Sequence, residues 1–202
     1  MTEDHLLPTD EANCERMAAV QAEMKARVAA AKERRGLIIV HTGDGKGKST
    51  AAFGMVARMV AHRRRCAVIQ FVKSKPDAVE KLLHAPGVAW HAVGDGFTWN
   101  TQDRAADIAR CQEGWRLARE HFQDPKVSLV LLDELNIALA YHYLATEEVL
   151  AGLRAKRPEL HVVITGRGAP PALIELADLV TEMRLVKHPF AAGVKAQLGI
   201  EY

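Results

Sequence analysis

The sequence has few cysteines, no long apolar run and almost no net charge. Its three cysteines, Cys14, Cys66 and Cys111, are far apart and odd in number, which excludes a disulfide framework and a zinc site built from paired cysteines. No uncharged apolar run approaches the ~20 residues that a membrane-spanning helix needs. The first residues do not show the basic segment followed by an apolar segment that is typical of a secretory signal peptide. We therefore expect a soluble protein of the reducing cytoplasm, with no membrane partner.

The charges are nearly balanced, with 27 Lys and Arg against 25 Asp and Glu and a formal net charge of +2. A dedicated nucleic-acid-binding protein would carry a concentrated basic excess, so we expect no nucleic-acid partner. The 202 residues, 49% hydrophobic and 26% charged, exclude a disordered chain or a coiled-coil rod. This length suits one well-buried domain with an appendage.

The appendage is predicted at the N-terminus, in residues 1–35. Residues 10–35 are rich in Ala, Glu, Lys and Arg and contain neither Gly nor Pro, so they predict a helix. Its larger apolar residues recur at steps of three and four and form a narrow stripe: Met17, Val20, Met24 and Val28. Two interpretations are open: the helix packs on its own domain, or it is an arm that covers a ligand site or a second subunit.

Residues 36–202 alternate short apolar runs with helical segments. The runs lack the two-residue alternation of a half-exposed strand, which favours a buried parallel sheet. Strands are predicted at 37–41, 67–72, 88–93, 129–133, 161–165 and 179–185, and helices at 48–62, 76–84, 101–122, 136–143, 146–156 and 170–176. The pattern predicts an α/β domain with a doubly wound, mainly parallel six-stranded sheet.

A glycine-rich loop follows the first predicted strand, over residues 42–50. Gly43, Gly45 and Gly47 allow a tight path whose amides point inward, and the helix start that follows adds the positive end of its dipole. Thr42 stands where the pattern G-x-x-x-x-G-K-[ST] needs a glycine, and Gly43 comes one place late. The loop therefore predicts a phosphate site that holds its phosphates in an unusual way.

Polar side chains in and after the loop suit a nucleotide with a metal ion. Lys48 would place a charge on phosphate oxygens, and the Ser49 hydroxyl could bind magnesium. Asp133 and Glu134 end an apolar strand, where an acid can hold the metal or its water shell. Neighbouring residues of a strand point to opposite sides, so only one acid is expected to face the nucleotide. These features predict a P-loop NTPase fold of the RecA-like type.

Three further features leave alternatives open. Phe97 and Trp99 lie in a Gly-flanked loop, where they form either an apolar platform for a large flat ligand or a plug in the core. Arg167 is either a phosphate clamp or an ordinary surface residue. His188 and Lys195 follow the last predicted strand, at the same sheet edge, and could be solvated residues.

The sequence resembles the ATP:corrinoid adenosyltransferases that carry a modified phosphate loop. The matching blocks are residues 42–54, 70–73, 96–99, 132–135, 165–168 and 188–202, in that order. The resemblance covers residues 36–202 and implies transfer of the 5′-deoxyadenosyl group of ATP to the Co(I) centre of a corrinoid, with release of triphosphate. In this family the loop grips the triphosphate in a reversed sense.

The resemblance also implies roles for individual residues. It implies that Lys48, Glu134 and Arg167 are catalytic, that Ser49 and Glu134 hold Mg²⁺ or Mn²⁺, and that Phe97 and Trp99 lie beneath the corrin ring and exclude water from cobalt. The ATP-binding positions that it implies are Thr42, Gly43, Asp44, Gly45, Lys46, Gly47, Lys48, Ser49, Thr50, Arg58 and His188. Family members usually have Asn at position 44, so Asp44 predicts weaker binding of ATP.

The implied partners are a second copy of the chain, in a homodimer, and an electron-donating flavoprotein. Two other functions fit the motifs: an ordinary P-loop ATPase or small-molecule kinase, and an ATP-responsive corrinoid carrier without catalysis. The identity of the products separates the enzymes, because only adenosyl transfer releases triphosphate.

Overall fold

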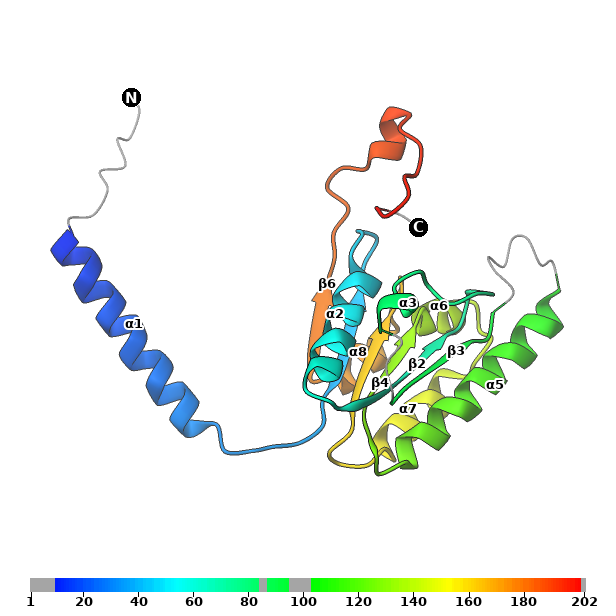
Figure 1. The fold of residues 1–202 in the computed structure, drawn as a ribbon, viewed down its shortest axis with the longest axis horizontal. Coiled ribbons are helices and arrows are strands. Elements are labelled where there is room, and N and C mark those ends of the chain that lie inside the picture. The colour runs from blue at the N-terminus through cyan, green and yellow to red at the C-terminus, as the bar shows by residue number, and fades with distance from the viewer. Residues whose placement is uncertain (1–9, 84–86, 95–102, 201–202) are drawn as a thin grey trace. The chain divides into compact units, whose positions relative to one another are not determined.

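The computed structural model describes residues 10–83, 87–94 and 103–200. The chain divides after Arg34 into two compact units, which are described one at a time. Figure 1 shows the helix of the first unit and the sheet of the second. No helix in the described ranges is both long enough and apolar enough to cross a membrane.

The described residues of the first unit, 10–34, contain one helix, α1 (Asp10–Ala30). Asp10 and Glu11 lie in its first turn and Arg27 in its last, an order of charges that favours a helix through its dipole. The predicted helix is present but ends five residues before the expected residue 35. None of its residues is buried, and the side chains of the apolar stripe are all 47–69% exposed.

The second unit is built on one six-stranded sheet. Its strands are β1 (Ile38–Thr42), β2 (Arg65–Gln70), β3 (Val88–Ala92), β4 (Val127–Asp133), β5 (His161–Thr165) and β6 (Leu179–Glu182). They lie in the order β3-β2-β4-β5-β1-β6, and all neighbours are parallel. The predicted parallel α/β sheet is confirmed, and β5 has the predicted bounds.

Seven helical segments of the second unit are described. They are α2 (Lys48–Ala61), α3 (Glu80–Leu83), α5 (Arg104–Gln123), α6 (Leu135–Ala140), α7 (Thr146–Arg154), α8 (Pro171–Leu176) and the 3₁₀ helix η1 (Pro189–Ala192). The helix predicted at 76–84 is much shorter, because Asp77 forms a turn in which its Oδ1 accepts from the amide of Val79 (3.2 Å). The last strand ends three residues early because the chain turns onto the glycine loop at Met183.

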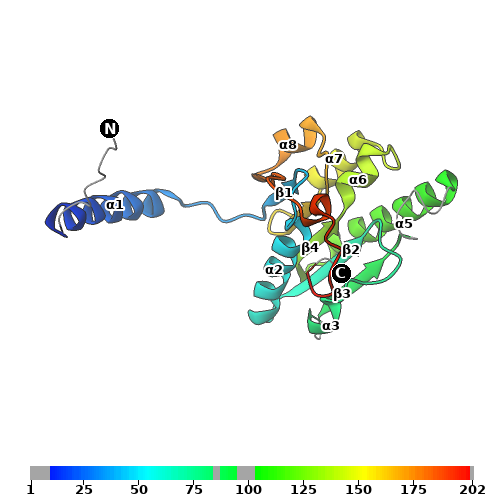
Figure 2. The same ribbon diagram turned by 90° about the horizontal axis from the view of Figure 1, so that it is seen from above.

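Apolar side chains cover both faces of the sheet. Ile38 and Val40 join the core beneath α5, α6, α7 and α8, whereas Ile39 between them joins the core beneath α2 and α3. Figure 2 shows α2 and α3 on one side of the strands and α6 to α8 on the other. The four central strands, β2, β4, β5 and β1, are buried along nearly their whole length because helices cover both of their faces, whereas the edge strand β6 is mostly exposed.

All six strands run in the same direction, so the segments that follow them meet at one edge of the sheet. The glycine loop follows β1, Glu134 follows β4 and Gly166 follows β5. In open parallel sheets, ligands bind outside the carboxyl ends of the strands. The candidate site therefore lies at this edge.

Candidate functional site

The glycine loop is held against the segment that follows β6. The amide of Gly45 donates to Met183 O at 2.7 Å, and the amide of Met183 donates to Thr42 O at 2.8 Å. Gly43 has a φ of 93°, and a Cβ at that position would lie 2.4 Å from Met183 O. A residue with a side chain at position 43 would meet both a strained backbone and a clash. This contact explains the place of Gly43 in the loop.

Lys48, the first residue of α2, points its ammonium into the loop. Its Nζ donates to Gly43 O at 2.8 Å and to Gly45 O at 2.6 Å, and the residue is only 7% exposed. Burial lowers the pKa of Lys48, and the nearby carboxylate of Glu134 opposes that shift. A cation is therefore held at the centre of the glycine loop, beside the start of a helix whose free amides favour anions.

The hydroxyl residues of the loop have different surroundings. Thr42 is buried at the end of β1, and its Oγ1 accepts from the amide of Ala169 at 3.2 Å. That bond ties β1 to the segment after β5 and gives a structural reason for a threonine where the usual loop has glycine. Ser49 is half-buried and Thr50 is exposed, both in the first turn of α2.

Asp133 lies at the end of β4 and is fully buried, with 0% exposure. Its Oδ2 accepts from Gln70 Nε2 and its Oδ1 accepts from Thr165 Oγ1, both at 2.8 Å. Glu134 follows with φ 62° and ψ 22°, a left-handed conformation that costs a residue with a side chain about 1–2 kcal/mol. Such conformations cluster at functional sites.

The carboxylate of Glu134 lies beside β5 and among charges. A Cβ on Gly166 would lie 3.1 Å from Glu134 Oε2. Burial raises the pKa of Glu134, and the charge of Asp133 raises it further, whereas Lys48, Lys73 and Arg167 act to lower it. The two acids thus differ in surroundings: Asp133 is enclosed by hydrogen bonds, and Glu134 is near the loop cation.

Arg167 and Asp44 form a contact that the sequence analysis missed. Arg167 Nη2 donates to Asp44 O at 3.4 Å, and Arg167 Nε lies 4.0 Å from Asp44 Oδ1. Both side chains are more than half exposed, so the pair contributes at most about 1 kcal/mol. It connects the glycine loop to the end of β5 and gives the Asp44 charge a partner. Lys46, the second lysine of the loop, is exposed.

The remaining predicted residues come from other segments of the chain. Arg58 is exposed in the last turn of α2, ten residues after Lys48 and thus about 15 Å along the helix. His188 precedes η1, and its Nδ1 accepts from the amide of Phe190 at 3.1 Å. Phe97 and Trp99 lie outside the described residues.

Two side chains at the end of β2 belong to this edge but were given no role in the sequence analysis. Gln70 is its last residue, and Lys73 Nζ lies 3.9 Å from Asp133 Oδ2 and is bonded to Asp77. Their position after an apolar strand is the signal that could have found them, because every parallel strand ends at the same edge.

The oxygen donors at this edge fit a magnesium ion. Ser49 and Glu134 offer a hydroxyl and a carboxylate, the hard ligands that Mg²⁺ prefers. No group of three or more His, Cys, Asp or Glu suited to a metal ion occurs among the described residues. A nucleotide-bound Mg²⁺ does not require one, because it keeps several waters and is held by one or two protein oxygens and the phosphates.

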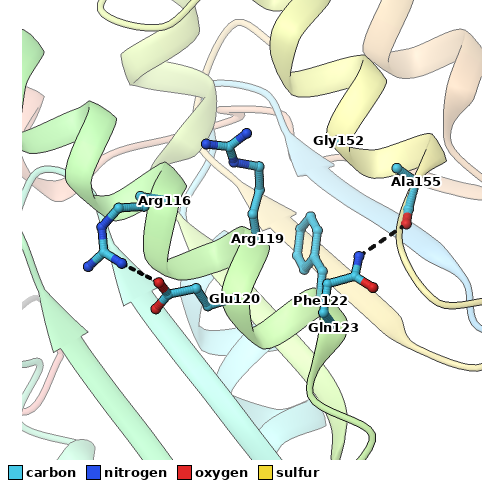
Figure 3. Close-up of a pocket in the computed structure, with 7 residues that line it drawn as sticks. All are labelled: Arg116, Arg119, Glu120, Phe122, Gln123, Gly152 and Ala155. Atoms are coloured by element: carbon cyan, nitrogen blue, oxygen red, sulfur yellow. Dashed lines mark hydrogen bonds and ion pairs between the residues drawn. The ribbon is translucent and has the colours of Figure 1, made fainter.

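A separate cavity of about 530 Å³ lies between α5 and α7 (Figure 3). Its lining residues are Arg116, Arg119, Glu120, Phe122, Gln123, Gly152 and Ala155. None of the predicted site residues lines it. The end of α5 leads into the start of β4, so the cavity is near the opposite edge of the sheet from the glycine loop.

Comparison with known proteins identifies the family of this chain. Residues 34–202 match the family described as ATP:corrinoid adenosyltransferase BtuR/CobO/CobP. The chain is 48% identical to a corrinoid adenosyltransferase of Pseudomonas aeruginosa over 96% of its own length and 97% of that protein. It is 49% identical to a corrinoid adenosyltransferase of a Sinorhizobium species, over 93% of this chain and 90% of that protein. It is 47% identical to a corrinoid adenosyltransferase of Escherichia coli K12, over 96% of this chain and 100% of that protein. The chain therefore belongs to the ATP:corrinoid adenosyltransferase family.

Proposed function

We propose that the protein transfers the 5′-deoxyadenosyl group of ATP to the Co(I) centre of a corrinoid and releases triphosphate. The observation that carries the proposal is the Lys48 ammonium at the centre of the glycine loop, with the Glu134 carboxylate among its neighbouring charges. In this proposal residues 36–202 form the adenosyltransferase domain, and residues 1–35 are a helical extension.

The reaction breaks a carbon–oxygen bond, not a phosphorus–oxygen bond. Co(I) donates an electron pair to the 5′ carbon of ATP, the cobalt–carbon bond forms, and triphosphate leaves with the electron pair of the broken bond. The charge that develops is on the leaving triphosphate. Fixed donors at a leaving group lower the barrier because they need no reorganisation during the step.

The loop supplies such donors. We assign the triphosphate to Lys48 and the amides of residues 43–47, and we assign Arg167 to the outer side of the phosphates. To reach the phosphates, Lys48 Nζ would exchange its bonds to Gly43 O and Gly45 O for phosphate oxygens. The remaining assigned ATP contacts are Thr42, Asp44, Lys46, Ser49, Thr50, Arg58 and His188.

Ser49 and Glu134 would hold Mg²⁺ in the proposed site, and Mn²⁺ could replace it. When bound, the ion neutralises part of the phosphate charge. Glu134 must be ionised for this role, and because its pKa is raised, protons compete with the metal at a higher pH than they would at an ordinary glutamate.

The corrinoid side of the proposal rests on the resemblance. Phe97 and Trp99 would lie beneath the corrin ring and exclude water and the lower ligand from cobalt, which makes Co(II) easier to reduce. We also propose a homodimer, an electron-donating flavoprotein partner and a cytoplasmic location.

An anaerobic assay with ATP, Mg²⁺ and chemically prepared Co(I) cobalamin tests the function. Light-sensitive adenosylcobalamin is the expected product, and its formation is measured from the optical spectrum. Cobinamide serves as a second acceptor. ADP with orthophosphate, or a phosphorylated acceptor, would replace the proposal with an ATPase or kinase. Binding of ATP and corrinoid without a cobalt–carbon bond would replace it with a carrier.

A further inference from the structure

The buried side-chain amide of Gln70 lies next to the acidic residues of the site. Gln70 is the last residue of β2, is 0% exposed and lies beside Asp133 in the register of the sheet. Its Nε2 donates to Asp133 Oδ2 at 2.8 Å. This bond connects β2 to the carboxylate that precedes Glu134.

The orientation of the Gln70 amide is fixed by two donors. Its Oε1 accepts from the indole Nε1 of Trp90 at 2.8 Å and from the amide of Asp77 at 3.0 Å. Because an indole nitrogen and a backbone amide only donate, the atom between them must be the oxygen of the amide. The nitrogen of Gln70 is thereby directed at Asp133.

Asp133 receives a hydrogen bond on its other oxygen as well. The amide of Glu134 donates to Thr165 Oγ1 at 3.0 Å, so the hydroxyl hydrogen is directed to Asp133 Oδ1. Both oxygens of Asp133 therefore accept a hydrogen bond, which fixes the orientation of the carboxylate. The ammonium of Lys73, 3.9 Å from Oδ2, adds a positive charge to the same side.

We propose that Gln70 is a positioning residue of the nucleotide site: it fixes the carboxylate of Asp133 next to Glu134, where a divalent cation arrives with ATP. The proposal rests on the proposed function, because it needs ATP with its metal ion at this edge. Hydrogen-bond partners behind metal-binding residues change metal affinity or activity by about 10–100-fold when they are removed. Gln70 acts through Asp133 and does not touch the nucleotide.

A purely structural role gives a different expectation. In that case Gln70 only ties β2 to Trp90 and to the turn at Asp77, and its loss would lower stability without a specific effect on the metal. The ratio of the Kd of ATP in EDTA to the Kd in Mg²⁺ separates the two roles. It measures how much the cation contributes to binding, and general loosening of the fold does not move it selectively.

The experiment is calorimetric titration of the full chain with ATP, in Mg²⁺ and in EDTA, without corrinoid. We expect Gln70→Met to lower the ratio by about tenfold and to leave the Kd in EDTA unchanged. Trp90→Phe removes one of the two donors to Gln70 and keeps a ring against Phe53, whose centroid is 5.6 Å away, so a smaller drop is expected. Val149→Ala, a buried change in α7, is the control and should leave the ratio unchanged.

An unchanged ratio in Gln70→Met would overturn the inference, as would an equal drop in Val149→Ala. The same holds if Mg²⁺ does not tighten ATP binding to the unaltered protein. Should Gln70→Met not fold, Trp90→Phe decides: a lowered ratio supports the inference and an unchanged ratio overturns it. Because no corrinoid is present, failure of adenosyl transfer in the separate assay would leave this result intact.

Discussion

Replacement of Lys48 by methionine removes the loop cation and keeps the length of the side chain. Two charge-assisted hydrogen bonds disappear, to Gly43 O and Gly45 O. Each such bond contributes about 1.5 kcal/mol or more. Burial lowers the pKa of Lys48, so removal of the buried charge offsets part of that loss. We expect a net decrease in the free energy of unfolding of about 2 kcal/mol.

The effect on activity should be larger than the effect on stability. Loss of one fixed donor at a developing negative charge lowers kcat by about 10²–10³. For a domain of this size, about 2 kcal/mol corresponds to a fall in Tm of roughly 4–8 °C, so Lys48→Met should still be folded at 25 °C. Adenosylcobalamin formation from Co(I) cobalamin at saturating ATP measures the first quantity, and thermal unfolding measures the second.

Lys126→Met is a matched control, since Lys126 is exposed before β4, near the opposite edge of the sheet. It should change neither quantity. A folded Lys48→Met variant with the activity of the control would refute the role of the loop cation. A large loss in both variants would show that the assay responds to charge in general.

Three further changes test other parts of the site. Glu134→Gln should abolish most activity yet raise the free energy of unfolding at pH 7. The folded-state pKa of Glu134 is raised, so its ionisation destabilises the fold as pH rises through that pKa. The gain in stability should therefore vanish in acid, and a gain that stays constant with pH would contradict the assignment. Gly43→Ala should lower the free energy of unfolding by about 1–3 kcal/mol because of its φ of 93° and the contact with Met183 O. Gly54→Ala in α2, where an added Cβ meets nothing within 4 Å, should raise that free energy by about 0.5–1 kcal/mol. Equal Tm values for the two variants would refute the loop contact. Asp44→Asn removes a negative charge from the loop and should tighten ATP binding by about two- to fivefold in calorimetry, with a smaller gain at high salt. Weaker binding would show that the ion pair of Asp44 with Arg167 matters more for ATP binding than the negative charge does.

The sheet could be predicted from the sequence because its four central strands, β2, β4, β5 and β1, are mainly apolar on both faces. β5 has the predicted bounds, and the loop before α2 has the predicted position. These features depend on local pattern alone. The glycines and lysine of residues 42–50 predicted an anion site for the same reason.

Contacts between distant segments could not be predicted. The last strand ends early because Met183 bonds to the glycine loop, about 140 residues away in sequence. The pairs Arg167 with Asp44 and Gln70 with Asp133 likewise depend on the order of strands in the sheet. The order β3-β2-β4-β5-β1-β6 brings them together, and local pattern does not contain it.

Product stoichiometry tests the central claim most directly. With ATP and Co(I) cobalamin under anaerobic conditions, phosphorus NMR would measure triphosphate while the optical spectrum measures adenosylcobalamin. Attack at the 5′ carbon requires one triphosphate for each cobalt–carbon bond formed, and that equality is the predicted result. Adenosylcobalamin formed with a different phosphate product, or ATP consumed to ADP and orthophosphate without a cobalt–carbon bond, would contradict the account.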